Sequence, residues 1–509
     1  MPRRDFFSLS PVFGVMHMFP SIRSHSQYQC FVQEQLRHCF VDTARTLFPA
    51  DLALIHKFWI TDLSRTASLL STSYGNKGPA PRDPADLLRS YLLMLELRQT
   101  SVTRWVDLLR RCDLYAILSG FTPGNVPGVG TFYDFFHRLW NHPADHLCGH
   151  LKPPKQKPKK GKNGDKAPTT STGQVARLAK RLQQYPKSQP PMAAGTLFEL
   201  FNELFVIPSA SRGLLGDLKR LTIAADGTPV RTSSLGRSKR VCSCRVQGIN
   251  SCSCRRHYSQ PDCDYGWDSS RKCYFHGYHL YMFTAADSKH DLPLYPRLHR
   301  ASRHDSLSLL VSAHEFSYRF PFFTWSKVLL DAAHDAMPIY KFLLAKGVEP
   351  FIDLNPRNFG NATYKEDFTL SSNGVPLCKK GLPMKSDGYD YTRGRRKYRC
   401  PLMKNRKVIC DMPCSNSSCG RTVYTYTKEN PRLFPSVARH SDEWRRIYAR
   451  RTTVERCNKR EKNDYMLEAA HHRSTRMWSI RLYGIMMCQH LDAWAEECTL
   501  VLDSSLFVA

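Results

Sequence analysis

The sequence predicts an α/β protein in which a core of strands and helices follows a mostly α-helical N-terminal region. Apolar residues recur at helical spacing up to about residue 145, whereas from residue 221 short apolar runs alternate with helical segments. A stretch of Lys, Pro, Gly and Thr separates the two patterns. We therefore expect a helical region over 1–150, a linker over 151–175 and a second domain over 176–509.

The N-terminal region is expected to contain several short helices. One begins at Pro84, and others cover 101–109 and 131–139, with apolar residues at helical spacing in each. Short helices on a basic chain suit a DNA-binding region, and a plain helical bundle is equally compatible. The linker that follows is rich in lysine and almost free of apolar residues. Such a flexible basic segment binds phosphates without sequence preference.

The second domain begins with a helical stretch over about 175–206, and then the order of elements changes. Strands are expected at 221–225, 274–286, 292–299, 327–330 and 350–354, and helices at 306–318, 336–346 and 441–470. Three strands, helix, strand, helix, strand, helix is the order of the ribonuclease-H-like α/β fold. The segment at about 358–440 is then a large, partly β insertion before the last helix.

The chain is strongly basic. Lys and Arg total 74 against 44 Asp and Glu, which gives a formal net charge of +30 over 509 residues. Such an excess indicates a polyanionic partner, and the composition argues against a free-standing metabolic enzyme, a disordered protein and a collagen-like chain. No run of about 18 uncharged apolar residues occurs, and the first 20 residues make a poor secretory signal. We expect a cytoplasmic protein with no membrane partner.

Two aspartates, Asp226 and Asp331, follow apolar strands directly. Ligands and catalytic groups gather at strand ends in open α/β sheets, although a single such aspartate more often caps a turn. Two of them with a glutamate from a late helix would make a cage of hard oxygen ligands for two Mg²⁺ ions. Asp335 lies four residues further on, and we expect it to cap the next helix instead.

The expected last helix carries four functional side chains, Tyr448, Arg451, Glu455 and Lys462. On a regular α-helix these positions lie within roughly 60° of each other, so they form one stripe. A solvated charged face is the competing interpretation in a region so rich in Arg and Lys. An ordinary exposed helix, however, has no reason to set this order at this spacing.

This stripe resembles the Y-(2)-R-(3)-E-(6)-K signature of DDE transposases of the insertion-sequence-4 type. The segment 223–228 around Asp226 is similar to the strand of the first acid in that family, and 328–335 around Asp331 is similar to the strand of the second. Here Ala333-His334 replaces the usual Gly-Tyr of the second motif. Segment 277–280, the pair His304-Asp305 and the helical region 84–139 also resemble parts of such transposases, so the resemblance covers about 80–145 and 220–490.

The resemblance implies a cut-and-paste transposase that nicks DNA at transposon ends and transfers the freed 3′-hydroxyl into target DNA. Asp226, Asp331 and Glu455 would be the catalytic residues and would hold two Mg²⁺ ions, for which Mn²⁺ can substitute. Arg451 and Lys462 would bind phosphates near the cut, and Tyr448 would contact a sugar or a phosphate.

The resemblance also implies double-stranded DNA as partner, at the transposon ends and at the target, and a homodimer in a synaptic complex. The motif handles a hairpinned DNA end in relatives, so a hairpin step is implied as well. By the same resemblance the protein would be prokaryotic, cytoplasmic and associated with the nucleoid.

Cysteines cluster within a segment covering 240–273. Four of them, Cys242, Cys244, Cys252 and Cys254, form two C-x-C pairs that could supply a tetrahedral zinc site, with His257 and Cys263 nearby. The C-x-C spacing is not the common C-x-x-C spacing of zinc sites. Reduced thiols in a basic loop are therefore an equally good interpretation.

The insertion at about 358–440 combines cysteines with basic residues. Arg395, Arg396 and Lys397 are candidate DNA-binding residues there, because a basic, partly β segment is suited to gripping DNA. In related transposases this insertion contacts transposon ends. A zinc knuckle is an alternative use of its cysteines, which are Cys378, Cys400, Cys410, Cys414 and Cys419.

Two other functions remain open. A ribonuclease-H-like DNA nuclease that cleaves without strand transfer would use the same acids, but the four-residue stripe argues against it. A zinc-containing DNA-binding protein, such as a transcription factor, would explain the charge and the cysteines but would leave the three acids to chance. A DNA-binding protein with a decayed site would lack one of the acids, yet all three are present.

Overall fold

The computed structural model describes residues 22–75, 80–140, 147–148, 173–184, 193–234, 236–356, 368–405 and 407–498. The chain forms two compact units. The first comprises Met1–Asp145, Pro191–Arg212 and Glu461–Ala509, and the second comprises His146–Pro190 and Gly213–Arg460. The linker expected at 151–175 lies outside the described residues except for its last three positions, and its boundaries remain a prediction.

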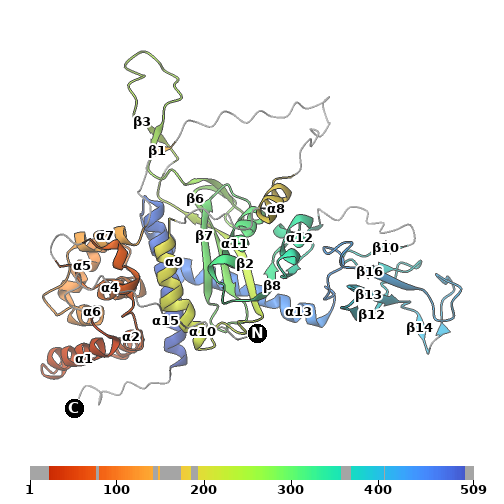
Figure 1. Cartoon of the computed structure of the whole chain (residues 1–509), viewed down its shortest axis with the longest axis horizontal. Helices are drawn as coiled ribbons and strands as arrows, with labels where there is room; N and C mark the ends of the chain where they lie inside the picture. Colours follow the sequence, from red (N-terminus) through yellow and green to blue (C-terminus); the bar gives the residue numbers. More distant parts are fainter. Residues whose placement is uncertain are drawn as a thin grey trace, which may run out of the picture. The chain divides into compact units, whose positions relative to one another are not determined.

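The first unit is helical, as predicted for the N-terminal region (Figure 1). Its α-helices are α1 (His25–Leu36), α2 (Pro49–Trp59), α3 (Thr66–Leu69), α4 (Pro84–Glu96), α5 (Val102–Arg111), α6 (Asp113–Ser119), α7 (Val129–Arg138), α9 (Gly195–Phe201), α10 (Ile207–Ser211) and α15 (Thr475–Glu497). Helix α4 begins where expected because Asp83 accepts a hydrogen bond from the Ala85 amide and Pro84 takes the first helical position. Among the described helices, none combines the length and the apolar character that a membrane span requires.

Helix α15 was not predicted from the sequence. It is buried on every side between Trp478 and Leu491, so it has no polar face to produce an amphipathic pattern. It also buries Arg481, whose guanidinium donates to the main-chain carbonyls of Tyr465 and Met466. These bonds satisfy a charge that would otherwise argue against a core helix.

The second unit is built on a mixed sheet. Its strands are β2 (Leu221–Arg231), β5 (Asp264–Asp268), β6 (Cys273–Ala285), β7 (Pro293–Arg300), β8 (Trp325–Leu330) and β9 (Glu349–Ile352). The order across the sheet is β7, β6, β2, β8, β9, and β5 pairs with the first part of β6. Strands β2, β6 and β7 pair antiparallel, whereas β8 and β9 continue the sheet in parallel.

Helices complete the layers around this sheet (Figure 1). They are α8 (Gln174–Gln184), α11 (Asp305–Arg319), α12 (Met337–Ala345), α13 (Asp442–Tyr448) and α14 (Thr452–Lys459). Helix α11 packs on β2, β6 and β7, and α14 packs on β2 and β6. The predicted succession of three strands, helix, strand, helix, strand, helix is confirmed, with β5 as an additional strand before β6, and with it the ribonuclease-H-like core.

The last helix differs from its prediction as one regular α-helix over 441–470. Helix α13 passes through a 3₁₀ turn, η6 (Ala449–Arg451), into α14, which ends in a π-helical turn, η7 (Arg460–Asp464). Such irregular turns change the angle per residue. The stripe angle calculated for an ideal helix therefore does not apply along the whole segment.

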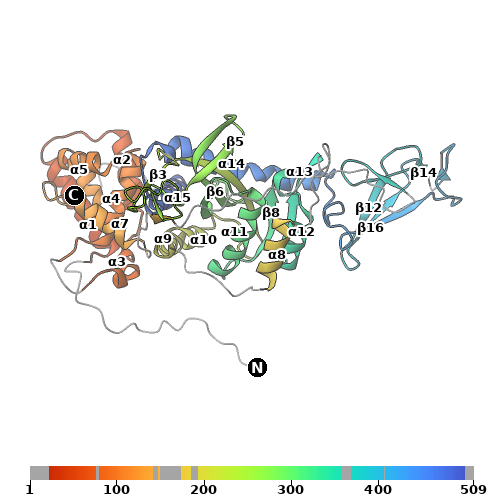
Figure 2. The same cartoon turned by 90° about the horizontal axis from the view of Figure 1, so that it is seen from above.

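The insertion is partly β, as expected. It contains β10 (Thr369–Leu370), β11 (Pro376–Leu377), β12 (Lys385–Asp390), β13 (Arg395–Arg399), β14 (Met403–Lys404), β15 (Lys407–Val408) and β16 (Thr422–Tyr426). Strands β12, β13 and β16 form an antiparallel sheet over a small core of Val375, Met384, Tyr398 and Val423. In both views these strands form a group separate from the main sheet (Figure 1 and Figure 2). A further small sheet joins β1 (Leu147–Cys148), β3 (Ser238–Arg240) and β4 (Arg256–Tyr258).

Candidate active site

Strand register brings Asp226 and Asp331 together. Ala224 on β2 is paired in parallel with Leu329 on β8, and the two aspartates each lie two residues further along. Neighbouring strands are about 4.8 Å apart, so the two carboxylates lie side by side at one edge. Strand β8 ends at Leu330, but β2 continues to Arg231 because β6 pairs with it along this length. Asp226 therefore lies within its strand, where the parallel partner stops, and not after the strand's end as predicted.

The two carboxylates influence each other electrostatically. Burial, and next the negative charge of Asp331, raise the pKa of Asp226 to about 7. The main-chain amide of Gly227 donates to Asp226 at 2.8 Å and opposes this shift. Two carboxylates thus share a mostly buried edge, where the charge of one opposes ionisation of the other. Carboxylate oxygens grouped in this way fit a divalent cation such as Mg²⁺.

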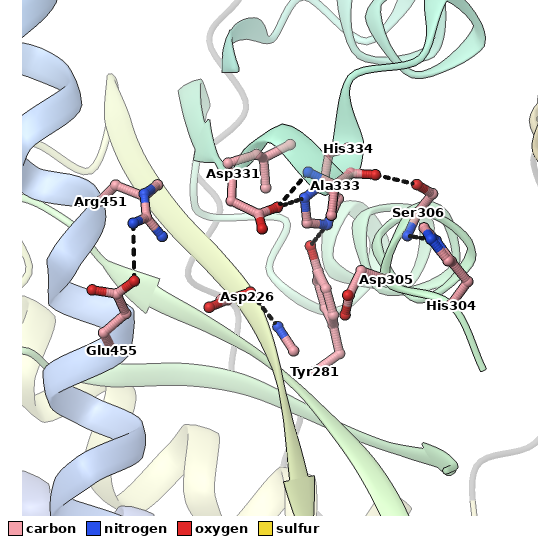
Figure 3. Close-up of polar contacts among 12 residues, drawn as sticks. Asp226, Tyr281, His304, Asp305, Ser306, Asp331, Ala333, His334, Arg451 and Glu455 are labelled. Carbon is pink, nitrogen blue, oxygen red and sulfur yellow. Dashed lines mark hydrogen bonds and ion pairs between the residues drawn. The ribbon is translucent and has the colours of Figure 1, made fainter. Parts of the chain in front are cut away.

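Asp331 is held by its own turn. It caps the 3₁₀ turn η4 (Ala332–His334), accepting from the Ala333 amide at 3.1 Å and from His334 Nδ1 at 2.6 Å. His334 is fully buried, and its Nε2 forms a 2.8 Å hydrogen bond with the Tyr281 hydroxyl from β6. Figure 3 shows these groups in a row, Tyr281 to His334 to Asp331. Burial would raise the pKa of Asp331 and lower the pKa of His334. The hydrogen bond and the charge attraction between the two side chains outweigh burial, so the pKa of Asp331 is lowered and the pKa of His334 is raised.

A second histidine–aspartate pair lies beside the first acid. His279 Nε2 of β6 and Asp305 Oδ1 at the start of α11 are 2.7 Å apart. Burial alone would raise the pKa of Asp305, but the interaction with His279 and the charge of that histidine lower it. A Cβ added at Gly227 would lie 2.0 Å from Asp305 Oδ1 and 2.3 Å from His279 Cε1, so only glycine leaves room for this pair.

This pair was not assigned to the site from the sequence, although both residues lie in segments that resemble the family. The sequence contains one signal for this pair, which is the glycine directly after Asp226. A glycine next to or within a strand often marks the close approach of another group. Asp305 adds a further carboxylate whose charge raises the pKa of Asp226.

Glu455 and Arg451 lie on the helical segment that packs beside β2 (Figure 3). Arg451 Nη2 donates to Glu455 Oε1 at 2.9 Å, an i,i+4 pair one helical turn apart. The Glu455 side chain is 48% exposed, so its carboxylate remains accessible. Burial would lower the pKa of Arg451, but neighbouring groups that include Tyr448, Glu455 and Asp226 raise it. The guanidinium therefore lies within electrostatic reach of Glu455 and Asp226.

The other two stripe residues take different positions. The Tyr448 hydroxyl donates to the main-chain carbonyl of Leu330 at 3.0 Å, which ties α13 to the strand that precedes Asp331. Lys462 lies in η7, in the part of this turn that belongs to the first unit. Trp444 on α13 is buried, and its ring lies 4.7 Å from the ring of Phe351, so it packs in the core.

Asp335 does not cap the next helix as predicted. Helix α12 has Ala336 at its N-cap position, with no side-chain cap. The carboxylate of Asp335 is buried and accepts two bonds from Arg432, at 2.8 and 2.7 Å, and one from the Asn355 amide at 2.7 Å. A buried carboxylate needs such partners, so Asp335 links the core to the insertion.

The candidate DNA-binding residues of the insertion lie on β13, where successive side chains point to opposite faces. Arg395 lies over the Tyr424 ring, and Lys397 Nζ is 3.1 Å from Asp387. Arg396, on the other face, donates to the Ser386 hydroxyl at 2.9 Å and also to the Ser436 carbonyl. Alternation along the strand places Arg395 and Lys397 on one surface and Arg396 on the other.

The structure brings Cys242, Cys244, Cys252 and Cys254 together, with their sulfur atoms all within 4.8 Å of one another. Over the described part of the chain, this is the one such group, and neither His257 nor Cys263 belongs to it. Cys263 is buried and contacts Gln260 instead. The cysteines of the insertion do not form a comparable group within the described ranges.

Comparison with known proteins identifies the family. The family model described as "Transposase DDE domain" matches residues 217–491, more than half of the chain. The match includes the whole mixed sheet, both aspartates and Glu455. A comparison with curated proteins found no match. The chain therefore belongs to the transposase DDE domain family, whose members are enzymes that bind DNA, cleave it and transfer its strands with the help of divalent metal ions.

Proposed function

We propose that this protein is a cut-and-paste transposase of the insertion-sequence-4 type. It would cleave DNA at transposon ends and join the freed 3′-hydroxyl to target DNA. The observation that carries the proposal is the strand register that places Asp226 beside Asp331, with the helix of Glu455 packed on the same strand. The Tyr448, Arg451, Glu455 and Lys462 spacing supports the subgroup.

Asp226, Asp331 and Glu455 are the residues proposed to hold two Mg²⁺ ions, for which Mn²⁺ can substitute. Their donors are carboxylate oxygens only, and burial together with the charge of Asp331 raises the pKa of Asp226. When bound, such ions supply stabilisation of negative charge on the attacking and leaving oxygens of an in-line displacement at phosphorus. His334 fixes the orientation of Asp331 for this purpose.

Basic residues of the four-residue stripe are proposed to bind the DNA. Arg451 pairs with Glu455 without DNA, and it can turn its planar fork of N–H groups to a phosphate when DNA is present. Lys462 would act as a point charge on a neighbouring phosphate. Tyr448 anchors α13 to β8, and any contact between its ring and a sugar would be made from that position.

Other parts of the chain are proposed to extend the DNA contact. Arg395 and Lys397 share one surface of β13 and suit a phosphate backbone, whereas Arg396 serves the fold of the insertion. The helical region 1–150 is proposed to bind DNA, with 151–175 as a flexible basic linker. A homodimer on paired ends, and a location at the nucleoid, complete the proposal.

Substitution of each acid tests the assignment. We expect Asp226→Asn, Asp331→Asn and Glu455→Gln to lose cleavage of DNA that carries the transposon ends, because each removes a charged metal ligand. Binding of the same DNA, measured by gel shift, should remain close to wild type. Glu443→Gln, an exposed glutamate on α13, is the matched control and should cleave normally. Near-normal cleavage by one of the three variants would show that its acid is wrongly assigned.

A further inference from the structure

Four cysteines face one another in a hairpin that the proposed transposase chemistry does not use. The hairpin consists of β3, β4 and the loop 241–255 between them, and it projects away from the main sheet (Figure 1). Cys242 Sγ lies 3.6 Å from Cys252 Sγ, and Cys244 Sγ lies 3.5 Å from Cys254 Sγ. All four are free thiols.

The hairpin brings the thiols together because its two strands return side by side. Arg240 pairs with Arg256 at the end of the ladder. Cys242 and Cys254 each lie two residues beyond this last pair. The chain turns back between Cys244 and Cys252, so the C-x-C pairs of the two arms face each other.

The spacing of the sulfur atoms matches a single tetrahedral ion. Four thiolates bound to zinc at about 2.3 Å would be separated by about 3.8 Å along each edge of the tetrahedron. The sulfur atoms of two cysteine pairs are 3.6 and 3.5 Å apart, slightly less than this value. All sulfur–sulfur distances in the group are within 4.8 Å. A disulfide needs about 2.05 Å, and a cluster of several iron atoms needs more space between its thiolates.

The loop lacks a hydrophobic core that could hold the thiols in place. Val246 is 91% exposed, and Val241 and Ile249 are also exposed. Its internal main-chain bonds are few and local, such as Ile249 N to Cys244 O at 2.8 Å, and Gly248 supplies a turn at φ +77°. A segment with so little buried apolar surface requires a disulfide or a metal to keep one conformation.

Positive charge surrounds the cluster. Arg256 is buried, and its Nη2 lies 3.6 Å from Cys252 Sγ and 3.4 Å from the Cys252 carbonyl. Arg240 donates to the Asn250 carbonyl on the other side of the loop. Four thiolates around one divalent ion carry a net charge of −2, which arginines close to the sulfur atoms offset.

We propose that Cys242, Cys244, Cys252 and Cys254 bind one Zn²⁺ ion in a structural site that fixes the basic hairpin 238–258. The four thiols release four protons to solvent as the ion binds, and no electron is transferred. With all four positions filled by protein ligands, the ion has no open position for catalysis. The proposal does not depend on the transposase function.

Metal analysis of the full-length protein tests the site. The protein is purified with a reductant from cells grown with added zinc, and its metal content is measured by plasma mass spectrometry. We expect about one zinc per chain. In Cys244→Ser and Cys254→Ser the zinc content should fall about tenfold or more, because a three-thiolate site binds far more weakly. Cys419→Ser, which removes an exposed cysteine of the insertion, is the matched control and should keep its zinc.

Two further measurements separate zinc binding from a loss of folding in the variants. Wild-type protein that is stripped with a chelator and refilled with Co²⁺ should show the intense visible bands of a tetrahedral thiolate site. Trypsin should cut the stripped protein at Arg245 or Arg255, and added Zn²⁺ should protect both positions. Zinc-free or iron-containing wild type, disulfides between these cysteines in cells, or zinc retained by Cys244→Ser would overturn the proposal.

Discussion

His334 connects Tyr281 to Asp331 through two hydrogen bonds, at 2.8 and 2.6 Å, in a fully buried position. A partner that holds a metal-ligating carboxylate in one orientation typically changes metal affinity 10–100-fold when it is removed. We therefore expect His334→Ala to weaken Mn²⁺ binding by about that factor, as measured by electron paramagnetic resonance titration. His334→Gln, which keeps a donor in the side chain, should recover part of the affinity. Equal Mn²⁺ affinity in His334→Ala and wild type would exclude this positioning role.

The contacts of Asp268 predict that the stability of the fold depends on pH. It accepts bonds from Ser270 Oγ at 2.7 Å and the Arg271 amide at 3.1 Å, and it pairs with Arg231 at 3.0 Å. Burial opposes these contacts, but together they lower the pKa of Asp268 to about 2. A lowered pKa stabilises the fold above the unfolded pKa of about 3.9, and this contribution is lost as the pH falls toward 2.

The size of this contribution is about 2 kcal/mol. Asp268→Asn should therefore lower the free energy of unfolding by about that amount at pH 7, measured with urea. The difference between variant and wild type should shrink at pH 3. Ser302→Ala, which removes a donor to the nearby and more exposed Asp264, serves as the control. A difference that stays constant with pH would contradict the assigned cause.

At the scale of elements, one lysine ties three helices of the first unit. Lys57 Nζ on α2 lies 2.7 Å from Glu96 on α4 and 2.6 Å from Asp492 on α15, and Glu96 is only 8% exposed. Removing one partner of a buried ion pair typically costs 3–5 kcal/mol, because an uncompensated charge stays buried. We expect Lys57→Met to destabilise α15 by about 3 kcal/mol, seen as faster hydrogen exchange of its main-chain amides.

The exposed pair of Arg45 and Asp113 in the same unit provides the matched control. Such surface pairs contribute at most about 1 kcal/mol, so Arg45→Ala should leave the exchange of α15 nearly unchanged. If Lys57→Met exchanged no faster than Arg45→Ala, the ion-pair network would not hold α15 in place.

Elements with a clear local pattern could be predicted from the sequence. The apolar runs that became β2, β6 and β8 and the helical spacing of α4 are properties of neighbouring residues. Helix α15 could not be predicted because burial on all sides removes the amphipathic pattern. The continuation of β2 beyond Asp226 depends on pairing with β6, which lies about 50 residues away in the chain.

The same distinction applies to the candidate site. Asp226, Asp331 and Glu455 could be selected because strand ends and a fixed helical spacing are visible in the sequence. The contacts of Asp331 with Tyr281 through His334, and of His279 with Asp305, join segments that only the folded sheet brings together. The role of Asp335 was mistaken for the same reason, since its partner Arg432 lies in the insertion.

At the scale of the whole molecule, both the positive net charge and the chemistry of the family indicate DNA as the partner. A net charge of +30 favours binding to a polyanion of any sequence, whereas we propose that cleavage needs the acids of the second unit. Binding alone therefore cannot distinguish a transposase from a DNA-binding protein. Cleavage alone cannot distinguish a transposase from a nuclease.

The most direct test of the central claim is a joining assay with DNA that carries the element's terminal sequences, Mg²⁺ and a target duplex. Wild-type protein should yield both cleaved ends and products in which those ends are joined to the target. Glu455→Gln should yield neither while it still binds the DNA. Cleaved ends without joined products would indicate a nuclease, and the absence of both in Mg²⁺ and in Mn²⁺ would contradict the proposed catalytic function.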